Sequence, residues 1–201
     1  MSLTQPQFAP NLYDLIAMFR ADRVILLDED RWSRKGRTHR ASITESEWIN
    51  IPIKTDDKKK AIRKVCIDHD EDWFTPFWNG IHHNFHSAIW FDHFEDELLA
   101  LFESARSSEK LIDFNLTVFD ALLGFLEVDL SYELASSSDF DADAVTEVYQ
   151  EYQSKNYIHR IENAQAVTIN DPQIAHFAER SILHLLFYHG PESFKVLDLL
   201  K

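Results

Sequence analysis

Residues 2–30 read "SLTQPQFAPNLYDLIAMFRADRVILLDED" and contain three segments of different character. The segment "SLTQPQF" is strand-like and is closed by proline. "NLYDLIAMFRA" spaces its apolar residues at helical intervals, and Asn11 is suited to cap that helix. "RVILLDE" holds a compact apolar run typical of a buried strand. A strand, a helix and a strand within about thirty residues predict a βαβ unit and a partly parallel sheet.

Polar side chains follow both predicted strands. Gln5 comes directly after the first strand, and Asp28 and Asp30 follow the second. Open α/β sheets bind their ligands beyond the carboxyl ends of their parallel strands. We therefore expect these three residues to share one site, in which a carboxylate acts as general base or binds a hydroxyl group.

Beyond residue 30 the pattern predicts a strand-rich segment and then a mainly helical one. Further strands are predicted over residues 38–43, 47–54 and 61–68. From Asp72 an apolar stripe at helical spacing predicts a core made of Phe74, Phe77, Trp78, Ile81, Phe85 and Ala88. Further helices are predicted over residues 94–105, 109–128, 144–154 and 172–201, the last interrupted at Gly190, and short strands over residues 130–134, 156–161 and 164–169.

Length and composition fit one domain. A chain of 201 residues, 45% of them apolar, can bury a sizeable core. We expect a single domain over residues 1–201, with a strand-rich part at 1–70 and a mainly helical part at 71–201. The predicted fold is α/β: a Rossmann-like mixed sheet formed mainly by the N-terminal third, with a helical C-terminal half.

The positive charge of this acidic chain is concentrated near its start. Residues 1–64 hold 13 Lys and Arg against 9 Asp and Glu, the remainder holds 7 against 25, and the net charge is −14. Five cations fall within ten positions, namely Arg31, Arg34, Lys35, Arg37 and Arg40. The acidic body argues against nonspecific binding of nucleic acid. The basic cluster therefore predicts a local site for a small anion, or else a solvated face whose charges pair with the preceding acids.

Several classes of site have no support in the sequence. The chain has four glycines and shows no phosphate-binding loop, no dinucleotide fingerprint and no nucleophilic serine elbow. A bound phosphate would therefore be held by Arg and Lys side chains, and we expect no redox cofactor. No apolar run reaches the roughly 18–20 residues of a membrane span. Because the start also lacks a signal peptide and Cys66 is the single cysteine, we expect a cytoplasmic protein.

The segment "HHNFH" has the residue type and spacing of metal ligands. His82 and His86 lie one helical turn apart, and His93 falls near the same face if the helix continues. These residues border the apolar stripe, where a helix normally meets water, so we expect surface histidines and no metal. A metal-dependent hydrolase using these three histidines is the alternative. An exposed Trp32 or Trp90 would mark the contact of a homodimer.

Six segments, in order, resemble the WbqC-like family of bacterial proteins, which occur in O-antigen and other surface-polysaccharide loci. "TQPQFAP" is similar to the family's strand followed by a Q-P turn. "ADRVILLDEDRWSRKGRTHRASI" is similar to the family pattern "ADVFVILDDVQFSKRSWQNRNRI". The other four are "WINIPIK", "DWFTPFWNGIHHNFHSAIWFDHF", "ELASSSDF" and "RSILHLLFYHGPES". The resemblance covers most of the chain.

This resemblance implies an N-acyl or N-aminoacyl transferase that acts on a nucleotide-linked amino sugar. The donor would be a thioester on CoA or a carrier protein, or an activated amino acid, so the expected partner is a phosphate-bearing small molecule or carrier. Gln5 would bind the sugar, and Asp28 would accept a proton from the attacking amine. Arg34 and Arg40 would bind phosphate. The full set of positions implied is Gln5, Pro6, Asp28, Ser33, Arg34, Arg40, Trp73 and Ser137, with Asp30 and Lys35 beside them.

The chain also departs from the family pattern. Glu29 stands where the family has a second Asp, and His39 and Ala41 stand where it has two Asn residues. The region between Ser138 and the last helices is shorter than is usual in the family. These departures favour an alternative, a noncatalytic binding or assembly protein of the same pathway, which would bind a ligand without forming product.

Overall fold

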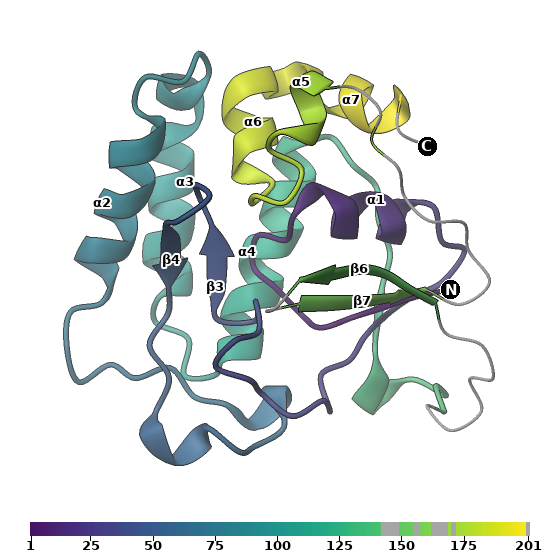
Figure 1. Ribbon diagram of the computed structural model, residues 1–201. Coiled ribbons are helices and arrows are strands. Elements are labelled where there is room, and N and C mark those ends of the chain that lie inside the picture. Colours follow the sequence, from purple (N-terminus) through teal and green to yellow (C-terminus); the bar gives the residue numbers. More distant parts are fainter. Residues whose placement is uncertain (142–148, 155–156, 162–168, 170–171, 200–201) are drawn as a thin grey trace.

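The computed structural model confirms the α/β class and the predicted βαβ unit (Figure 1). It describes residues 1–141, 149–154, 157–161, 169 and 172–199. The unit consists of β1 (Ser2–Thr4), α1 (Leu12–Phe19) and β2 (Val24–Leu26), and β1 pairs with β2 in parallel. The predicted cap is also present, because the Asp14 N–H donates to Asn11 Oδ1 at 2.8 Å.

The main sheet has the strand order β5-β2-β1-β7-β6. β5 (Glu133–Leu134) runs parallel to β2, and β7 (Tyr157–Ile161) runs antiparallel to β1. β6 (Tyr149–Ser154) pairs with β7, so the helix predicted over residues 144–154 is wrong from Tyr149 onward. The polar and aromatic residues of "YQEYQS" suit either structure, and the pairing with β7 selects the strand. The strand predicted over residues 164–169 falls outside the described residues except at its last position.

Two of the three strands predicted after residue 36 form a separate sheet. Among the described strands, β3 (Arg40–Ser42) and β4 (Trp48–Asn50) pair with each other alone, in antiparallel register. The strand predicted over residues 61–68 is wrong, because that segment contains the 3₁₀ turn η2 (Ile62–Lys64), which follows another such turn, η1 (Thr55–Asp57). Ile62 and Val65 are both fully buried. A 3₁₀ turn places residues three apart on one side, so it buries this pair where an alternating strand would not.

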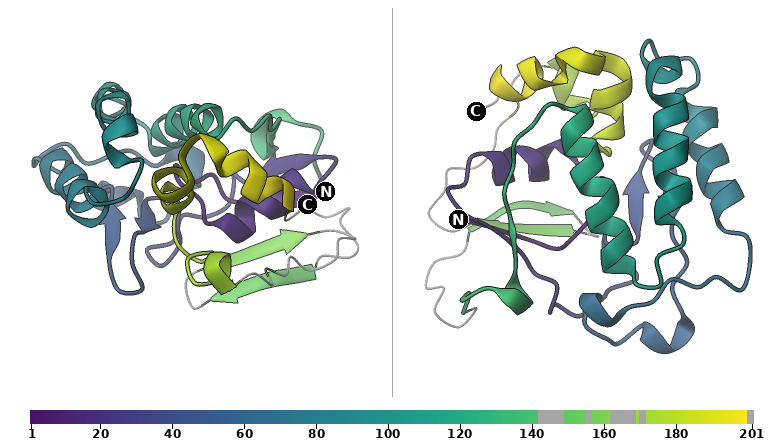
Figure 2. Two further views of the ribbon diagram at one scale, coloured as in Figure 1. Left: turned by 90° about the horizontal axis from the view of Figure 1, so that it is seen from above. Right: turned by 180° about the vertical axis from the view of Figure 1, so that it is seen from behind.

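Three predicted helices are confirmed, namely α2 (Phe74–Phe85), α3 (Phe91–Ala105) and α4 (Leu111–Phe125). Viewed from behind, α4 lies across the back of the sheet, with α3 beside it (Figure 2). Ring contacts join these layers: Phe77 lies 5.1 Å from Phe102 and 5.9 Å from Phe8, which follows β1. Phe8 also lies 5.7 Å from Phe114 of α4. The aromatic core thus fixes the helical half against the segment that leaves the first strand.

The last helical region is divided more often than the sequence indicates. It comprises α5 (Pro172–Ala175), α6 (Leu183–His189), the 3₁₀ turn η5 (Gly190–Glu192) and α7 (Ser193–Leu199), which Figure 1 shows together at one end of the molecule. The chain is not helical between α5 and α6. There the Ser181 N–H donates to the Ser42 carbonyl, and the Ile182 N–H donates to the Pro10 carbonyl. These bonds to other elements replace bonds along a continuous helix.

The exposed apolar surface differs from the one predicted. Trp32 is only 6% exposed, so it cannot form a dimer contact, and Trp90 is half-buried. In the described part of the chain, the large hydrophobic side chains that are exposed are Ile89 and Tyr188. None of the described helices is long and apolar enough to cross a membrane.

Gly190 ends α6 in a conformation that only glycine adopts easily, with φ of 56°. A Cβ atom at this position would lie 2.4 Å from the Trp90 ring. We predict that Gly190→Ala lowers the free energy of unfolding by about 2–4 kcal/mol, through backbone strain and steric overlap. Urea unfolding followed by circular dichroism measures this loss.

Gly124→Ala is the matched control, because a Cβ on this α4 residue would have no neighbour within 4 Å. Alanine is the better helix former, so this variant should gain about 0.5–1 kcal/mol. Equal effects of the two substitutions would contradict the packing described for Gly190.

Candidate functional site

The polar residues predicted to share a site lie at one edge of the main sheet. β1, β2 and β5 run parallel, so their carboxyl ends share that edge. Gln5 follows β1, Asp28 and Asp30 follow β2, and the 3₁₀ turn η3 (Ala135–Ser137) follows β5. This edge is where open parallel sheets bind ligands.

Gln5 and Asp30 contact each other across the first two strands. Gln5 Nε2 donates to Asp30 Oδ2 at 3.1 Å, and both side chains are partly exposed. The turn from Ser33 to Gly36 closes beside them, since a Cβ on Gly36 would lie 3.6 Å from Gln5 Oε1 and 3.2 Å from the Ser33 carbonyl oxygen. The closest of these contacts lies within the turn itself, and the Gln5 amide lies at an ordinary van der Waals distance from it.

Asp28 is enclosed. It is 1% exposed, and its two carboxylate oxygens accept the N–H of Ser136 at 2.9 Å and the hydroxyl of Ser136 at 2.5 Å. Its main-chain carbonyl accepts the N–H of Arg63 at 2.9 Å. Asp28 thus joins the end of β2 to η3 on one side and to η2 on the other.

Arg40 stabilises the loop of residues 31–40, which we call the basic loop. Its Nε and Nη2 atoms donate to the carbonyls of Gly36 at 2.9 Å and Lys35 at 2.8 Å. Its guanidinium also lies 4.2 Å from the centre of the Trp48 ring on β4. With these contacts the Arg40 side chain fixes the turn that contains Lys35 and Gly36. The residues exposed at the tip of the turn are Ser33, Arg34 and Lys35.

A buried amide connects this loop to the helical half. Asn115 of α4 is fully buried and donates through Nδ2 to the carbonyls of Pro6 at 3.1 Å and Thr38 at 2.8 Å. One side chain therefore fixes both the segment after β1 and the end of the basic loop. Next to Thr38, the His39 ring packs 4.9 Å from Trp32. Burial, and then the positive charges of nearby arginines, lower the pKa of His39 to about 4, so it is neutral near pH 7.

The other two positions implied by the resemblance, Ser137 and Trp73, differ in their surroundings. Ser137 is exposed in η3, and its hydroxyl contacts the Leu134 carbonyl at 3.4 Å. Trp73 precedes α2 and is buried against Phe77 and Phe114. Trp73 lines a different pocket, which it shares with His69, Glu71, Asp72, Phe74, Arg106 and Ser107. The structure therefore leaves Trp73 out of the sheet-edge cluster.

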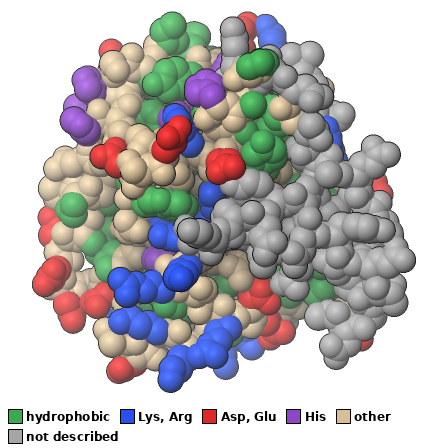
Figure 3. Space-filling model, viewed as in Figure 1, with side chains coloured by type: hydrophobic (Ala, Val, Ile, Leu, Met, Phe, Trp, Pro, Cys, Tyr) green, Lys and Arg blue, Asp and Glu red, His purple; other side chains and the backbone are tan. Residues whose placement is uncertain are grey.

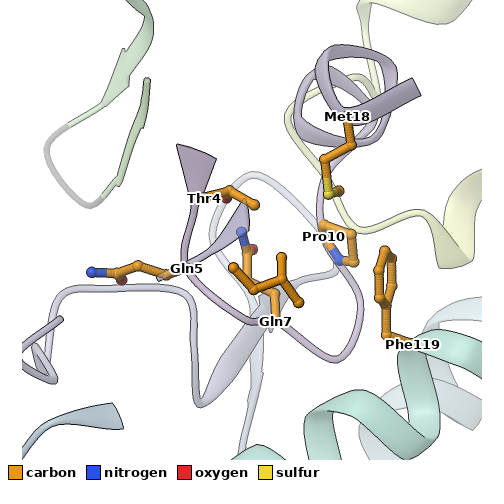
Figure 4. Close-up of a pocket in the computed structure, with 7 residues that line it drawn as sticks. Thr4, Gln5, Gln7, Pro10, Met18 and Phe119 are labelled. Atoms are coloured by element: carbon orange, nitrogen blue, oxygen red, sulfur yellow. The ribbon is translucent and has the colours of Figure 1, made fainter. Parts of the chain in front are cut away.

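A small pocket lies beneath the same edge, between α1, α4 and the first two strands. Met18 and Phe119 close it, and in Figure 4 the Gln5 side chain points away from the other lining residues. Gln7 donates to Asp14 at 3.1 Å beside it. None of the described residues that line this pocket is charged.

The histidines contact one another and nearby rings. His82 and His86 stack 5.7 Å apart, His82 Nε2 lies 3.5 Å from Glu95 Oε1, and His93 packs on Trp90 and Phe94. Across the described residues, no three His, Cys, Asp or Glu side chains are placed together to hold a metal ion. The histidine alternative therefore has no set of ligands in this part of the chain.

Two parts of the site were missed by sequence reasoning. Ser136, the partner of Asp28, stands in a run of three serines where nothing in the sequence marks one of them. The basic segment at residues 58–64 lies beside the first basic loop, since the Trp32 N–H donates to the Lys60 carbonyl at 3.0 Å. The excess of Lys and Arg over Asp and Glu in residues 1–64 was the sequence signal that could have identified this segment.

The WbqC-like protein family model matches residues 5–192, nearly the whole chain. No curated protein and no solved structure matches the chain.

We predict that Asp28→Asn lowers the free energy of unfolding by about 1–3 kcal/mol, because an amide cannot accept both Ser136 donors. Glu29→Gln is the matched control. Glu29 is exposed and pairs with Arg63 at 3.1 Å, so its change should stay within about 0.5 kcal/mol. Urea unfolding at neutral pH measures both. Equal stability of Asp28→Asn and the wild type would contradict the role given to this carboxylate.

Acid should destabilise the protein through His39 before the carboxylates titrate. The pKa of His39 is about 4 in the folded chain and about 6.5 when unfolded, so the unfolded state binds more protons between these values. The contribution of neutral His39 to the free energy of unfolding is then fully present above about pH 6.5 and is lost as the pH drops toward 4. Between pH 7 and 5 the loss due to this residue should be roughly 1–2 kcal/mol.

His39→Met removes this proton-binding group and should flatten the pH dependence by that amount. His184 is also buried and its pKa is also lowered to about 4, so part of the acid loss remains in the variant. Free energies of unfolding at pH 7 and pH 5 for wild type and variant test this, and identical pH dependence would contradict it.

Proposed function

Since the chain belongs to the WbqC-like protein family, we propose that it transfers an acyl or aminoacyl group to the amine of a nucleotide-linked sugar in surface-polysaccharide biosynthesis. The observation that carries the proposal is the Gln5–Asp30 pair, which lies at the carboxyl edge of the parallel strands. The exposed cations Arg34 and Lys35 lie on the loop that closes beside it. A carboxylate next to a phosphate-binding loop is what this reaction requires.

The diphosphate of the sugar nucleotide binds Arg34 and Lys35. Both side chains are exposed at the tip of the loop, and they provide a planar guanidinium and a mobile ammonium for phosphate oxygens. Arg40 keeps the loop in place through its bonds to the carbonyls beneath. This arrangement matches the absence of a glycine-rich loop from the sequence, because side chains replace backbone N–H groups as phosphate ligands.

Asp30 is the general base in this proposal, and Gln5 orients it. The sugar amine attacks the carbonyl carbon of a thioester donor, so that a C–N bond forms and the C–S bond breaks. The amine proton passes to the Asp30 carboxylate, and the departing sulfur leaves as a thiol after taking up a proton. Asp28 positions this edge through Ser136, since its own oxygens are both occupied.

A noncatalytic binding protein of the same pathway is the second candidate. The observation that favours it is the enclosure of Asp28, the carboxylate that the resemblance assigns to proton transfer. Such a protein would keep the phosphate-binding loop and bind the sugar nucleotide without forming an amide.

Thermal-shift assays test the proposed ligand class. We predict that nucleoside diphosphate-linked amino sugars raise the melting temperature, because a ligand at about 100 times its Kd adds about 2.7 kcal/mol. For a chain of this size the shift is roughly 5–10 °C. Arg34→Ala should lose most of it, whereas Arg106→Ala should keep it, because Arg106 is exposed over the Phe74 ring in the other pocket.

Product analysis separates the two candidates. With a thioester donor and a bound amino sugar, wild type should form an amide, and Asp30→Asn should form it at least about 100-fold more slowly while still binding the sugar. Full activity of Asp30→Asn would remove Asp30 from the role of base. A melting shift without any product would favour the binding protein, and no shift with any sugar nucleotide would contradict both.

A further inference from the structure

The basic loop does not stand alone, because a second basic segment lies against it. Residues 58–64 read "KKKAIRK" and, like residues 31–40, contain no acid. The Ile62 N–H donates to the Asp30 carbonyl at 2.9 Å, and Arg31 forms a bridge with Ala61. The two segments together hold ten of the twenty Lys and Arg residues of the protein. Figure 3 shows Lys and Arg side chains gathered at this lower part of the molecule.

Some of these ten cations form ion pairs or are buried. Lys60 pairs with Asp57, Arg63 pairs with Glu29, and Arg37 is buried. Apart from Lys60, six cations of the two segments are exposed, and we call them the cationic face: Arg31, Arg34, Lys35, Lys58, Lys59 and Lys64. This face adjoins the candidate site directly, because Arg31 follows Asp30 in the chain and the Asp30 carbonyl accepts the N–H of Ile62.

The cationic face carries more charge than one diphosphate needs. If Arg34 and Lys35 bind the sugar nucleotide, four cations are left over, and three of these are lysines. Lysines are mobile point charges that form weak, exchangeable pairs at an exposed surface. Such a surface is suited to steering a large anionic partner into a defined orientation.

The surroundings of the face distinguish among anionic partners. Trp32 is buried and Trp48 is covered by Arg40, so neither of these aromatic rings offers a stacking platform for nucleic-acid bases. Residues 65–201 carry a charge of −18, which repels a long polyanion that extends past the face. The exposed large hydrophobics of the described chain, Ile89 and Tyr188, lie between α2 and α3 and on α6, so the described part of the face lacks an apolar anchor for a lipid surface.

We infer that the cationic face docks a small acidic carrier protein, which presents the acyl group as a thioester on its flexible prosthetic arm. This inference rests on the proposed function and names its donor. Carboxylates of the carrier pair with Lys58, Lys59 and Arg31, and the thioester then lies beside the Gln5–Asp30 pair. The sugar nucleotide occupies Arg34 and Lys35, so donor and acceptor approach the same edge from adjacent surfaces.

A fluorescently labelled holo-acyl carrier protein of fatty-acid synthesis is the probe, and its binding is measured by anisotropy at low ionic strength. Wild type should bind it, with an affinity that falls as salt is added. The double variant Lys58→Glu/Lys59→Glu should bind about tenfold more weakly or worse. Lys195→Glu is the matched control, an exposed lysine on α7 at the other end of the molecule, and it should stay within about twofold. The double variant should keep its melting temperature, because both side chains are exposed.

Thermal shifts with sugar nucleotides, run on the same proteins, separate this inference from the proposed function. Unchanged sugar binding with no carrier binding would overturn the docking surface and leave the transferase. Carrier binding that depends on Lys58 and Lys59, without sugar binding, would support the docking surface and remove the transferase. Stronger binding of unfractionated tRNA than of the carrier, lost in the double variant, would overturn the inference in favour of a nucleic-acid partner.

Discussion

The hydrogen bonds of Asp28 connect the parts of this protein that otherwise lie far apart in the sequence. Its carboxylate binds the N–H and hydroxyl of Ser136, and its carbonyl accepts the N–H of Arg63. A buried carboxylate is stable only when donors surround it, so η3 is held where β2 ends, and the bond to the Asp28 carbonyl holds η2 there. Next to these bonds, the Asp30 carbonyl accepts the N–H of Ile62, so the segment 58–64 lies beside the Gln5–Asp30 pair.

The helical half supports the same edge from behind. Asn115 of α4 binds the carbonyls of Pro6 and Thr38, so one buried amide fixes the exits of β1 and the basic loop. The ring of Phe8 packs between Phe77 and Phe114 and anchors the start of the first connection. Rigid support of this kind lets a short exposed loop present charged groups in a constant geometry.

The charge distribution follows from the same topology. Residues 65–201 carry a charge of −18, whereas ten cations lie on two segments that bond to each other beside β2. Local repulsion among them is reduced where Lys60 and Arg63 pair with acids and where His39 stays neutral in its buried position. The cations that stay exposed face solvent next to the candidate site, which is why the proposed acceptor and the inferred donor protein share one edge.

The sequence by itself determined the βαβ unit, the α2, α3 and α4 helices, and the placement of Gln5, Asp28 and Asp30 at the ends of strands. These features depend on local periodicity, capping and strand order, which neighbouring residues specify. Only the tertiary structure decided that Tyr149–Ser154 is a strand, that residues 62–64 form a turn, and that Ser136 and not Ser137 binds Asp28. It also placed the segment 58–64 beside the first basic loop and Trp73 in a separate pocket. Each of these outcomes depends on a partner more than twenty residues away or on pairing with a neighbouring strand, and local pattern carries no information about such contacts.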